Sequence, residues 1–367
     1  MIDFNPFENE MSALHRAGRV RKRTIHPSHL VDLASNDYLG LAHNRTLVDK
    51  ALERLDGYES YAPKASMLVN GYHPIHKDFE NTLAQTHHFD DAIIVGSGFL
   101  ANIALIEALV RKEDGVIFDA DFHASGILAS KLTSGKVAFF RHNDAAHLRE
   151  VAVTMDVKRL YIVVEGVYSM TGDIAPREIF TVADELGAFL IVDEAHSSGV
   201  IGPRLLGIFD HYHITPHERH IKMGTLGKAY GSYGVYILAS APVIAFLENR
   251  AKSVIYTTAL SLFDTAMAYE SFLLIKNNTA TYQHKIEERQ ALAQEIIGVS
   301  TPSLILPIPA GSIDQLLHWH QTLHQQGFFI GAIRPPTVPS PILRMILRTP
   351  ISLTHVSEAL TLIKEMV

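Results

Sequence analysis

The fold of this chain is decided by LIVDEAH at residues 190–196 and by GTLGKAYG at residues 224–231. In the first stretch, an apolar run predicts a buried strand that ends in Asp193 and is followed by His196. In the second, Lys228 stands among glycines and other small residues, which is typical of a loop. The two stretches therefore place an acid, a histidine and a lysine at the ends of strands.

These three groups have separate tasks in the chemistry of pyridoxal 5′-phosphate (PLP). An amine such as that of Lys228 forms a Schiff base with the aldehyde of the cofactor, and small neighbours let the ring approach the backbone. A carboxylate such as Asp193 pairs with the pyridinium nitrogen, which keeps the ring protonated and able to accept electrons. Either residue alone could be structural, as a solvated lysine or a helix-capping acid. The pair in this context predicts a PLP enzyme.

On either side of these two stretches, strand-like and helix-like segments alternate along most of the chain. Apolar runs predict strands at 92–95, 115–118, 159–164, 189–192 and 235–238, with helices between them, among them 99–111 and 176–186. This alternation predicts a mainly parallel sheet covered on both faces, with ligands bound beyond the carboxyl ends of the strands.

After residue 245 the pattern changes to a long helical stretch at 260–292, short strands near 304–306 and 342–347, and a last helix at 354–366. We therefore expect an α/β fold with three parts. These are an N-terminal segment (1–45), a large PLP-binding domain (46–245) and a smaller α+β C-terminal domain (246–367).

Further polar or small residues follow the predicted strands. Gly98 and Phe99 begin a helix after a glycine turn, where backbone amides can hold a phosphate. His123 could stack on a cofactor ring or cap the next helix, and Ser169 could hydrogen-bond the cofactor or cap a turn. His196 would lie near the phenolic oxygen of the cofactor, and the Thr225 hydroxyl near its phosphate. Their repetition at successive strand ends favours the functional interpretation.

Composition excludes other classes of function. The net charge of −7, from 32 basic and 39 acidic residues, disfavours nucleic acid as a partner. The absence of cysteine excludes a disulfide scaffold, a thiolate metal site and a cysteine nucleophile. The 21 histidines include no His-Glu-x-x-His pattern, so no metal site is predicted. The N-terminus is mixed and acidic, and no apolar run approaches the roughly 18–20 residues that span a bilayer. We expect a soluble, cytoplasmic protein without a membrane partner.

The chain resembles the α-oxoamine synthases, a family of fold-type I PLP enzymes, over nearly its whole length. The resemblance is carried by SNDYLGL (35–41), GFLAN (98–102), DFHAS (121–125), EGVYSMTGD (165–173), VDEAHSSGVIG (192–202), the lysine loop and IYTT (255–258). It implies an aspartate aminotransferase-like fold with a seven-stranded sheet in the large domain.

The resemblance also implies roles for single residues. Lys228 would carry the cofactor, Asp193 would bind its ring nitrogen and His123 would stack on the ring. His196 would bond the ring oxygen, with Ser169 and Thr225 nearby. Thr258 would reach the phosphate held by a neighbouring subunit, which implies an obligate homodimer.

For the substrates, the resemblance implies an acyl thioester that meets Arg21 and an amino acid whose carboxylate meets an arginine on a C-terminal strand. Spacing from Pro339 favours Arg344 for this arginine, and spacing to His355 favours Arg348. The two would point to the same face of an extended strand, being four apart. We favour Arg344. The segment 61–72 is poorer in glycine than its family counterpart, so the resemblance implies nothing firm for that loop.

The run AIRPPTVP at 332–339 is close to a segment of family members that condense L-alanine with a pimeloyl thioester, with loss of carbon dioxide, in biotin biosynthesis. The pimeloyl group could arrive on coenzyme A or on acyl carrier protein. The alternatives are another member of the family, such as a 2-amino-3-ketobutyrate ligase or a long-chain aminoketone signal synthase, and a catalytically silent binding protein on the same fold.

Overall fold

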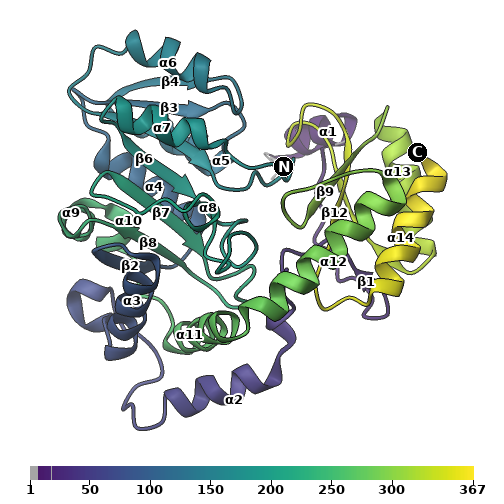
Figure 1. Ribbon diagram of the computed structural model, residues 1–367, viewed down its shortest axis with the longest axis horizontal. Coiled ribbons are helices and arrows are strands. Elements are labelled where there is room, and N and C mark those ends of the chain that lie inside the picture. Colours follow the sequence, from purple (N-terminus) through teal and green to yellow (C-terminus); the bar gives the residue numbers. More distant parts are fainter. Residues whose placement is uncertain (1–6, 18) are drawn as a thin grey trace, which may run out of the picture.

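Seven short strands form one sheet in the larger lobe of the protein (Figure 1). The structure is a computed structural model that describes residues 7–17 and 19–367. In spatial order the strands are β2 (Asp91–Val95), β8 (Val235–Ala239), β7 (His220–Thr225), β6 (Phe189–Asp193), β5 (Leu160–Glu165), β3 (Gly115–Asp119) and β4 (Lys136–Phe140). All run parallel except β8, which is antiparallel to both β2 and β7. The predicted mainly parallel, seven-stranded sheet is confirmed.

Helices cover both faces of this sheet because each central strand feeds two apolar cores. Successive side chains of a strand point to opposite faces, so Leu190 and Val192 of the central strand β6 pack into one core and Ile191 into the other. One face is covered by α4 (Gly98–Leu109), α5 (Ala124–Ser130), α9 (Ala241–Arg250) and α10 (Lys252–Ile255). The other is covered by α3 (Pro74–His87), α6 (Ala145–Val153), α7 (Arg177–Glu185), α8 (Ile208–His211) and α11 (Leu262–Asn277).

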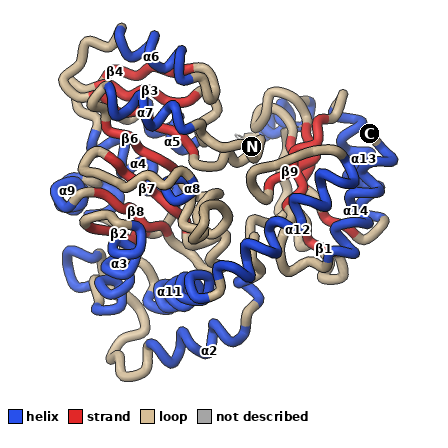
Figure 2. Tube along the Cα trace, in the orientation of Figure 1, coloured by secondary structure: helices blue, strands red, loops and turns tan. Residues whose placement is uncertain are grey.

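The smaller lobe is built on a three-stranded antiparallel sheet in the order β11 (Gly331–Ile333), β12 (Ile342–Ile346) and β9 (Ile305–Pro309) (Figure 2). Helices α12 (Thr279–Ile297), α13 (Ile313–Gln325) and α14 (Leu353–Met366) pack with it. A separate parallel pair joins β1 (Val31–Asp32) to β10 (Phe328–Phe329), so this part of the N-terminal segment belongs to the smaller lobe. The segment also contains α1 (Glu8–Arg16), and α2 (Arg45–Arg54) follows it.

The long helix expected at 260–292 is two helices, α11 and α12, separated at Asn278, whose backbone is not helical (φ −128°, ψ 28°). Helix α11 packs on α2 and α3 of the larger lobe, whereas α12 packs on α14 of the smaller lobe. The packing partners therefore change at Asn278, whereas the domain boundary that we expected between residues 245 and 246 stays a prediction.

Strand β7 was not predicted because HIKMGT contains two polar residues that are fully buried, His220 and Lys222. The Lys222 ammonium lies 3.2 Å from a carboxylate oxygen of Glu194 and donates to the Leu206 carbonyl. Burial of a charged group is tolerated when it is paired in this way. Among the helices that the structure describes, none is long and apolar enough to cross a membrane.

Candidate active site

The carboxyl ends of β5, β6 and β7 open into a cavity of about 250 Å³ at one edge of the large sheet. The cavity is lined by Gly98, Phe99, Asn102, His123, Glu165, Asp193, Ala195, His196, Met223, Thr225 and Lys228. Among the residues predicted to bind a cofactor, all but Ser169 and Thr258 lie in this wall. Parallel strands end at the same edge, which is why side chains far apart in sequence meet here.

Lys228 lies in the loop that connects β7 to β8, with its amine inside the cavity. Its Nζ is 2.7 Å from Nε2 of His196. Burial lowers the pKa of Lys228 to about 8, and the nearby carboxyl groups of Asp193 and Glu165 only partly offset this effect. The neutral amine, the form that a nucleophile or a base requires, is therefore far more populated near neutral pH than in an ordinary lysine.

His196 is buried and links Lys228 to Tyr38, whose hydroxyl lies 2.5 Å from Nδ1 of the histidine. Burial, together with the charges of Lys228 and Arg344, holds the pKa of His196 well below its ordinary value, so the ring is neutral. Burial also raises the pKa of Tyr38, which keeps its hydroxyl protonated. Tyr38 can therefore donate to Nδ1 and leave the ring hydrogen on Nε2, which faces the cavity.

Asp193 is held by two donors at the end of β6. Its Oδ1 accepts from the Ala195 amide at 2.9 Å, and its Oδ2 accepts from the side-chain amide of Asn102 at 2.9 Å. Asn102 also donates to the hydroxyl of Ser125 at 2.9 Å. Asn102 comes from α4, 91 residues before Asp193. We assigned it no role from the sequence, because no local pattern connects the two positions.

The same chain of hydrogen bonds orients His123. The Ser125 hydroxyl accepts from Asn102, so its own hydrogen is directed at Nδ1 of His123, 2.7 Å away. The Ser125 amide points at the same nitrogen from 3.3 Å. Burial, and then the charge of Lys228, lower the pKa of His123, although Asp193 opposes this. The neutral ring therefore carries its hydrogen on Nε2.

Glu165, at the end of β5, is a second residue of the cavity wall to which the sequence analysis gave no role. Its Oε2 accepts from the Ser169 amide at 3.1 Å, and its Oε1 is buried without a hydrogen-bond partner among the described residues. Burial and the neighbouring charge of Asp193 raise the pKa of Glu165 well above its ordinary value. Burial therefore favours the protonated form of this side chain.

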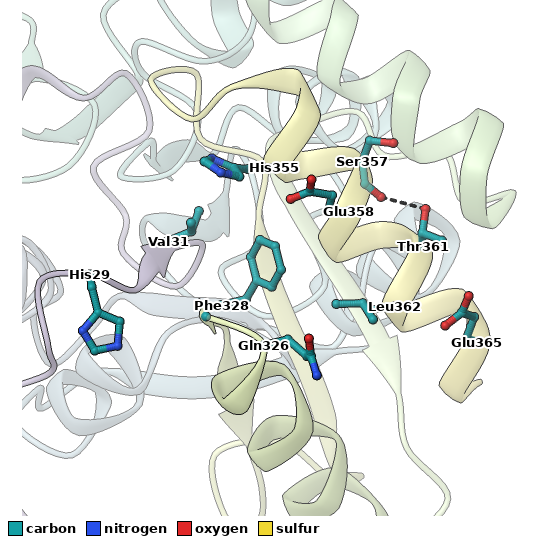
Figure 3. A pocket seen from close by; sticks show the side chains of 11 residues that line it. His29, Val31, Gln326, Phe328, His355, Ser357, Glu358, Thr361, Leu362 and Glu365 are labelled. Atoms are coloured by element: carbon teal, nitrogen blue, oxygen red, sulfur yellow. Dashed lines mark hydrogen bonds between the residues drawn. The ribbon is translucent and has the colours of Figure 1, made fainter.

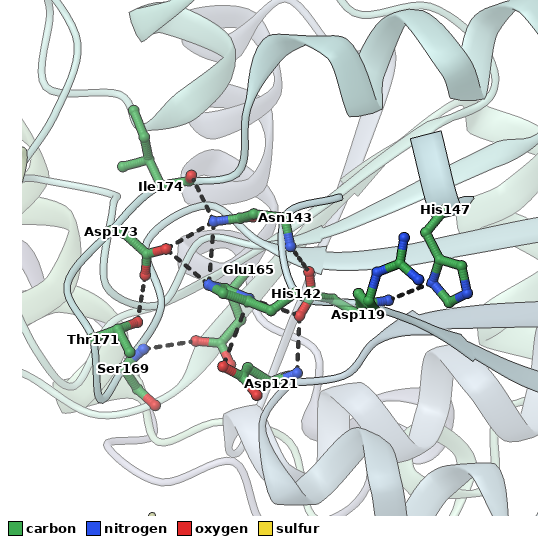
Figure 4. Close-up of polar contacts among 11 residues, drawn as sticks. Asp119, Asp121, His142, Asn143, His147, Glu165, Ser169, Thr171, Asp173 and Ile174 are labelled. Carbon is green, nitrogen blue, oxygen red and sulfur yellow. Dashed lines mark hydrogen bonds and ion pairs between the residues drawn. The ribbon is translucent and has the colours of Figure 1, made fainter. Parts of the chain in front are cut away.

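A polar network holds the segment that carries Glu165 and Ser169 (Figure 4). His142 lies between two carboxylates, with Nδ1 2.9 Å from Asp119 and Nε2 2.8 Å from Asp173. Burial alone would lower the pKa of His142, but the hydrogen bonds to Asp119 and Asp173 outweigh it and raise the pKa to about 10. A charged imidazolium therefore ties the loop after β5 to the end of β3.

The first turn of α4 supplies an anion-binding element to the cavity. Gly98 and Phe99 stand at the start of the helix and line the cavity, where backbone amides have no acceptor within the helix. These amides and the helix dipole favour a negatively charged group. Across from them, the Thr225 hydroxyl donates to the Gly234 carbonyl at 3.3 Å and accepts from the Gly227 amide at 3.2 Å.

The two candidate arginines have different surroundings. Arg344, on β12, is buried and donates to the Ser169 carbonyl at 2.7 Å and to Asn36 at 3.2 Å, and no carboxylate lies within ion-pair distance of it in the described chain. Arg348 follows the end of β12 and is paired with Asp32 and Asp37, both at 2.8 Å. The strand alternation that would place both on one face therefore does not apply, and only Arg344 has capacity for a further anion.

The remaining predicted residues lie outside the cavity. Ser169 contributes its backbone amide and carbonyl to the contacts of Glu165 and Arg344. Thr258 is exposed and forms an isolated bridge with Ser66, beside the π-helical turn Met67–Gly71 that ends the glycine-poor loop. Arg21 is also exposed, and it lines a different cavity, next to the loop that follows β11.

Cavity volume alone would select a different site. A cavity of about 590 Å³ lies in the smaller lobe, between β10 and the exposed side of α14, where Phe328, His355 and Glu358 face it (Figure 3). It contains no lysine and no set of groups that converge on one point. The smaller Lys228 cavity is the better candidate because its titratable groups have shifted pKa values and lie at strand ends.

Asp184, His217 and His220 also come together and could surround a metal ion. However, Nδ1 of His217 accepts from the Arg219 amide, and Nδ1 of His220 faces the His217 amide. With Nδ1 accepting, each ring carries a hydrogen on Nε2 and donates it to Asp184, at 2.8 and 3.2 Å. This arrangement leaves no lone pair on either Nε2 for a cation.

Comparison with known proteins gives one sequence family. The family described as "Aminotransferase class I and II" matches residues 28–360. A protein from Helicobacter pylori named "8-amino-7-oxononanoate synthase" is 43% identical over 356 residues, which are 96% of this chain and 95% of that protein.

Two solved structures are also similar. A serine palmitoyltransferase from S. paucimobilis, determined with bound PLP and myriocin, matches with a TM-score of 0.88 and 23% identity, over 100% of this chain and 98% of that one. An 8-amino-7-oxononanoate synthase from Francisella tularensis matches with a TM-score of 0.74 and 25% identity, over 92% of this chain and 97% of that one.

Proposed function

This chain belongs to the class I and II aminotransferase family, and on this premise we propose that it is a PLP-dependent acyltransferase that makes 8-amino-7-oxononanoate. The reaction joins L-alanine to a pimeloyl thioester and releases the thiol and carbon dioxide. The observation that carries the proposal is the 43% identity to the synthase from Helicobacter pylori over 96% of the chain. The resemblance to the α-oxoamine synthases is confirmed, and the alternative members of that family are not favoured.

Individual residues of the Lys228 cavity match the individual functional groups of PLP. The Lys228 amine would hold the aldehyde carbon, and the Asp193 carboxylate would hold the ring nitrogen. The amides of Gly98 and Phe99 would hold the phosphate, with Thr225 beside it. The donor set suits the cofactor because it offers one amine, one carboxylate and a helix start to three chemically different ends of one molecule.

When bound, PLP withdraws electrons from the α-carbon of an amino acid and so stabilises a carbanion there. The residues of the chain make this chemistry possible by controlling protons. After the substrate amine has displaced it, Lys228 can take the α-proton at Nζ, since a pKa of about 8 makes the neutral amine accessible near neutral pH. Asn102 keeps the Asp193 carboxylate directed at the ring nitrogen.

Two histidines would complete the site. His196 presents a hydrogen on Nε2, next to Lys228, where it can bond the ring oxygen. His123 presents a flat ring and a hydrogen on Nε2, which suits stacking and donation to the acyl carbonyl. Arg344 would bind the carboxylate of alanine, because it is buried beside the cavity wall and has no carboxylate partner among the described residues.

We also propose a homodimer with shared sites, located in the cytoplasm. Large apolar side chains are exposed on both sides of the bridge between Ser66 and Thr258, namely Leu68, Val69 and Tyr256. Exposed apolar clusters of this kind mark interfaces between proteins. Thr258 lies within this surface, as expected for a residue that reaches the site of a second subunit.

A substrate panel tests the proposed activity. Purified protein loaded with PLP is offered L-alanine, glycine or L-serine, each with pimeloyl, acetyl or decanoyl thioesters, and products are identified by mass. We expect product from L-alanine and the pimeloyl donor, and none from Lys228→Ala, which should remain folded. A preference for glycine with acetyl, or for decanoyl over pimeloyl, would assign the protein to a different member of the family.

A further inference from the structure

The cavity that Arg21 lines has a volume of about 460 Å³ and lies at the edge of the smaller lobe. It has no role in the chemistry described above. The N-terminal segment, α13 and the loop after β11 form its walls. Arg19, Arg21 and Arg334 line it together with His320, and the remaining lining residues are uncharged. The loop belongs to the proline-containing run at 332–339, which has no assigned role in the proposed reaction.

The three guanidinium groups of this basic cavity lack counter-charges. Within the described chain, no carboxylate lies within ion-pair distance of Arg19, Arg21 or Arg334, and no hydrogen bond occupies their side chains. Three like charges around one cavity repel one another and concentrate anions there. Guanidinium groups bind phosphate oxygens through paired hydrogen bonds, so phosphate esters suit the cavity.

Strands β11 and β12 extend from the wall of the basic cavity to a residue that contacts the loop beside the Lys228 cavity. Gly331 of β11 is paired with Arg344 of β12, which donates to the Ser169 carbonyl beside Glu165. Arg334 comes three residues after Gly331, which is roughly 10 Å along an extended chain. A thioester whose acyl end reaches the Lys228 cavity would therefore bring the outer end of its carrier arm near Arg334.

Resting on the proposed function, we propose that Arg19, Arg21 and Arg334 bind the phosphate ester at the outer end of the pantetheine arm that carries the acyl group. Coenzyme A and acyl carrier protein share this phosphate, so the site serves either donor. The basic cavity is open to solvent, as the outer end of a carrier arm requires. A terminal carboxylate on the acyl chain would instead need a pocket beyond the reacting carbon.

Calorimetric binding to the PLP-loaded protein tests this site without relying on turnover. The ligands are 4′-phosphopantetheine, pantetheine, inorganic phosphate and pimelate. The variants are Arg334→Gln and Arg19→Gln, with Arg23→Gln as the control, since it removes the same charge from the same basic run but does not line the cavity. We expect Arg334→Gln to weaken 4′-phosphopantetheine about tenfold or more, as for a lost charged hydrogen bond. Pantetheine binding and the Arg23→Gln protein should be unaffected.

Two further binding measurements distinguish coenzyme A from acyl carrier protein as the source of the phosphate. Coenzyme A and acyl carrier protein bearing 4′-phosphopantetheine should both bind more weakly to Arg334→Gln. A loss confined to the carrier protein would overturn the proposal, because it would show docking of an acidic surface. A loss confined to pimelate would also overturn it and assign the arginines to the acyl carboxylate. Product analysis of the wild type checks the proposed function separately, so a failure of either idea is recognised by itself.

Discussion

At the scale of single residues, the site depends on hydrogen bonds that assign protons to particular atoms. Asn102 donates to Asp193 and to Ser125, and the Ser125 hydroxyl then donates to His123. The result is a carboxylate fixed in direction and a histidine whose hydrogen points into the cavity. A small amide thus controls both groups that would face the cofactor ring.

Replacing Asn102 tests this control. Asn102→Ala removes the donor to Asp193 Oδ2, and we expect turnover to fall about ten- to a hundredfold, the effect of a lost hydrogen bond to a charged group. Cofactor absorbance should persist, because Lys228 is intact. The matched control is Asn249→Ala on α9, which bonds only a carbonyl of its own helix. Normal turnover in Asn102→Ala, measured under single-turnover conditions, would contradict the role.

Protonation of a buried acid gives a second prediction at this scale. Glu80 accepts from the Tyr72 hydroxyl at 2.5 Å and from the Ile94 amide at 2.8 Å, and burial raises its pKa to about 8. The folded protein therefore holds this proton up to about pH 8, whereas the unfolded chain releases it near pH 4.5. Between these values the folded state binds more protons, so this contribution to stability declines as pH rises.

We expect the free energy of unfolding to fall by about 2–4 kcal/mol between pH 5 and pH 8 from this group alone. Urea titrations across this range measure it. In Glu80→Gln the fall in the free energy of unfolding should be smaller by this amount, whereas Glu150→Gln, on the exposed surface of α6, should leave it unchanged. An unchanged slope in Glu80→Gln would show that other groups cause the pH dependence.

At the scale of elements, the end of β12 separates two arginines that look equivalent in the sequence. Arg344 lies within the strand and has only neutral partners, whereas Arg348 lies beyond it and ties the strand to Asp32 and Asp37 of the N-terminal segment. The first is suited to binding a substrate and the second to joining two segments of chain.

Replacing Arg348 by glutamine should therefore mainly lower stability, whereas replacing Arg344 by glutamine should mainly weaken alanine binding. Arg348→Gln leaves two carboxylates without their partner and should lower the free energy of unfolding by about 1–3 kcal/mol, less than for a fully buried pair because Asp32 is partly exposed. Arg344→Gln should raise the Michaelis constant for alanine at least tenfold, with a smaller loss of stability. Urea unfolding and alanine titrations of both proteins measure the two effects. The reverse pattern would make Arg348 the substrate-binding residue.

At the scale of the whole molecule, the cavity forms beside the junction of the two lobes. The larger lobe supplies Asp193 and Lys228, and Arg344 of the smaller lobe donates to the Ser169 carbonyl beside the cavity. Helices α11 and α12 join the lobes at Asn278. The exposed apolar surface around Thr258 supports the proposed homodimer.

Complementation between inactive variants tests shared sites. Lys228→Ala should be inactive, and Thr258→Ala should be strongly impaired if it reaches the phosphate in the other subunit. Mixing the two and allowing subunit exchange should restore activity, because each mixed dimer has one site with both residues intact. Sedimentation measures the dimer, and tagged subunits confirm the exchange. Confirmed exchange without recovered activity would argue against shared sites.

The sequence by itself determined the mainly parallel sheet and the acid, histidine and lysine at its edge. It could do so because an apolar run such as 190–193 specifies a buried strand locally, and parallel strands must end at one edge. The segments at 98–99, 123 and 225 were predicted for the same reason.

Only the tertiary structure decided the contacts between distant segments. It paired Asn102 with Asp193, left one buried oxygen of Glu165 without a partner among the described residues, distinguished Arg344 from Arg348, placed the change of packing partner at Asn278 and placed Arg21 and Arg334 around one cavity. Each of these outcomes depends on how finished elements pack against one another. Residue spacing along the chain does not determine such packing, because the packing depends on the shape and burial of whole surfaces.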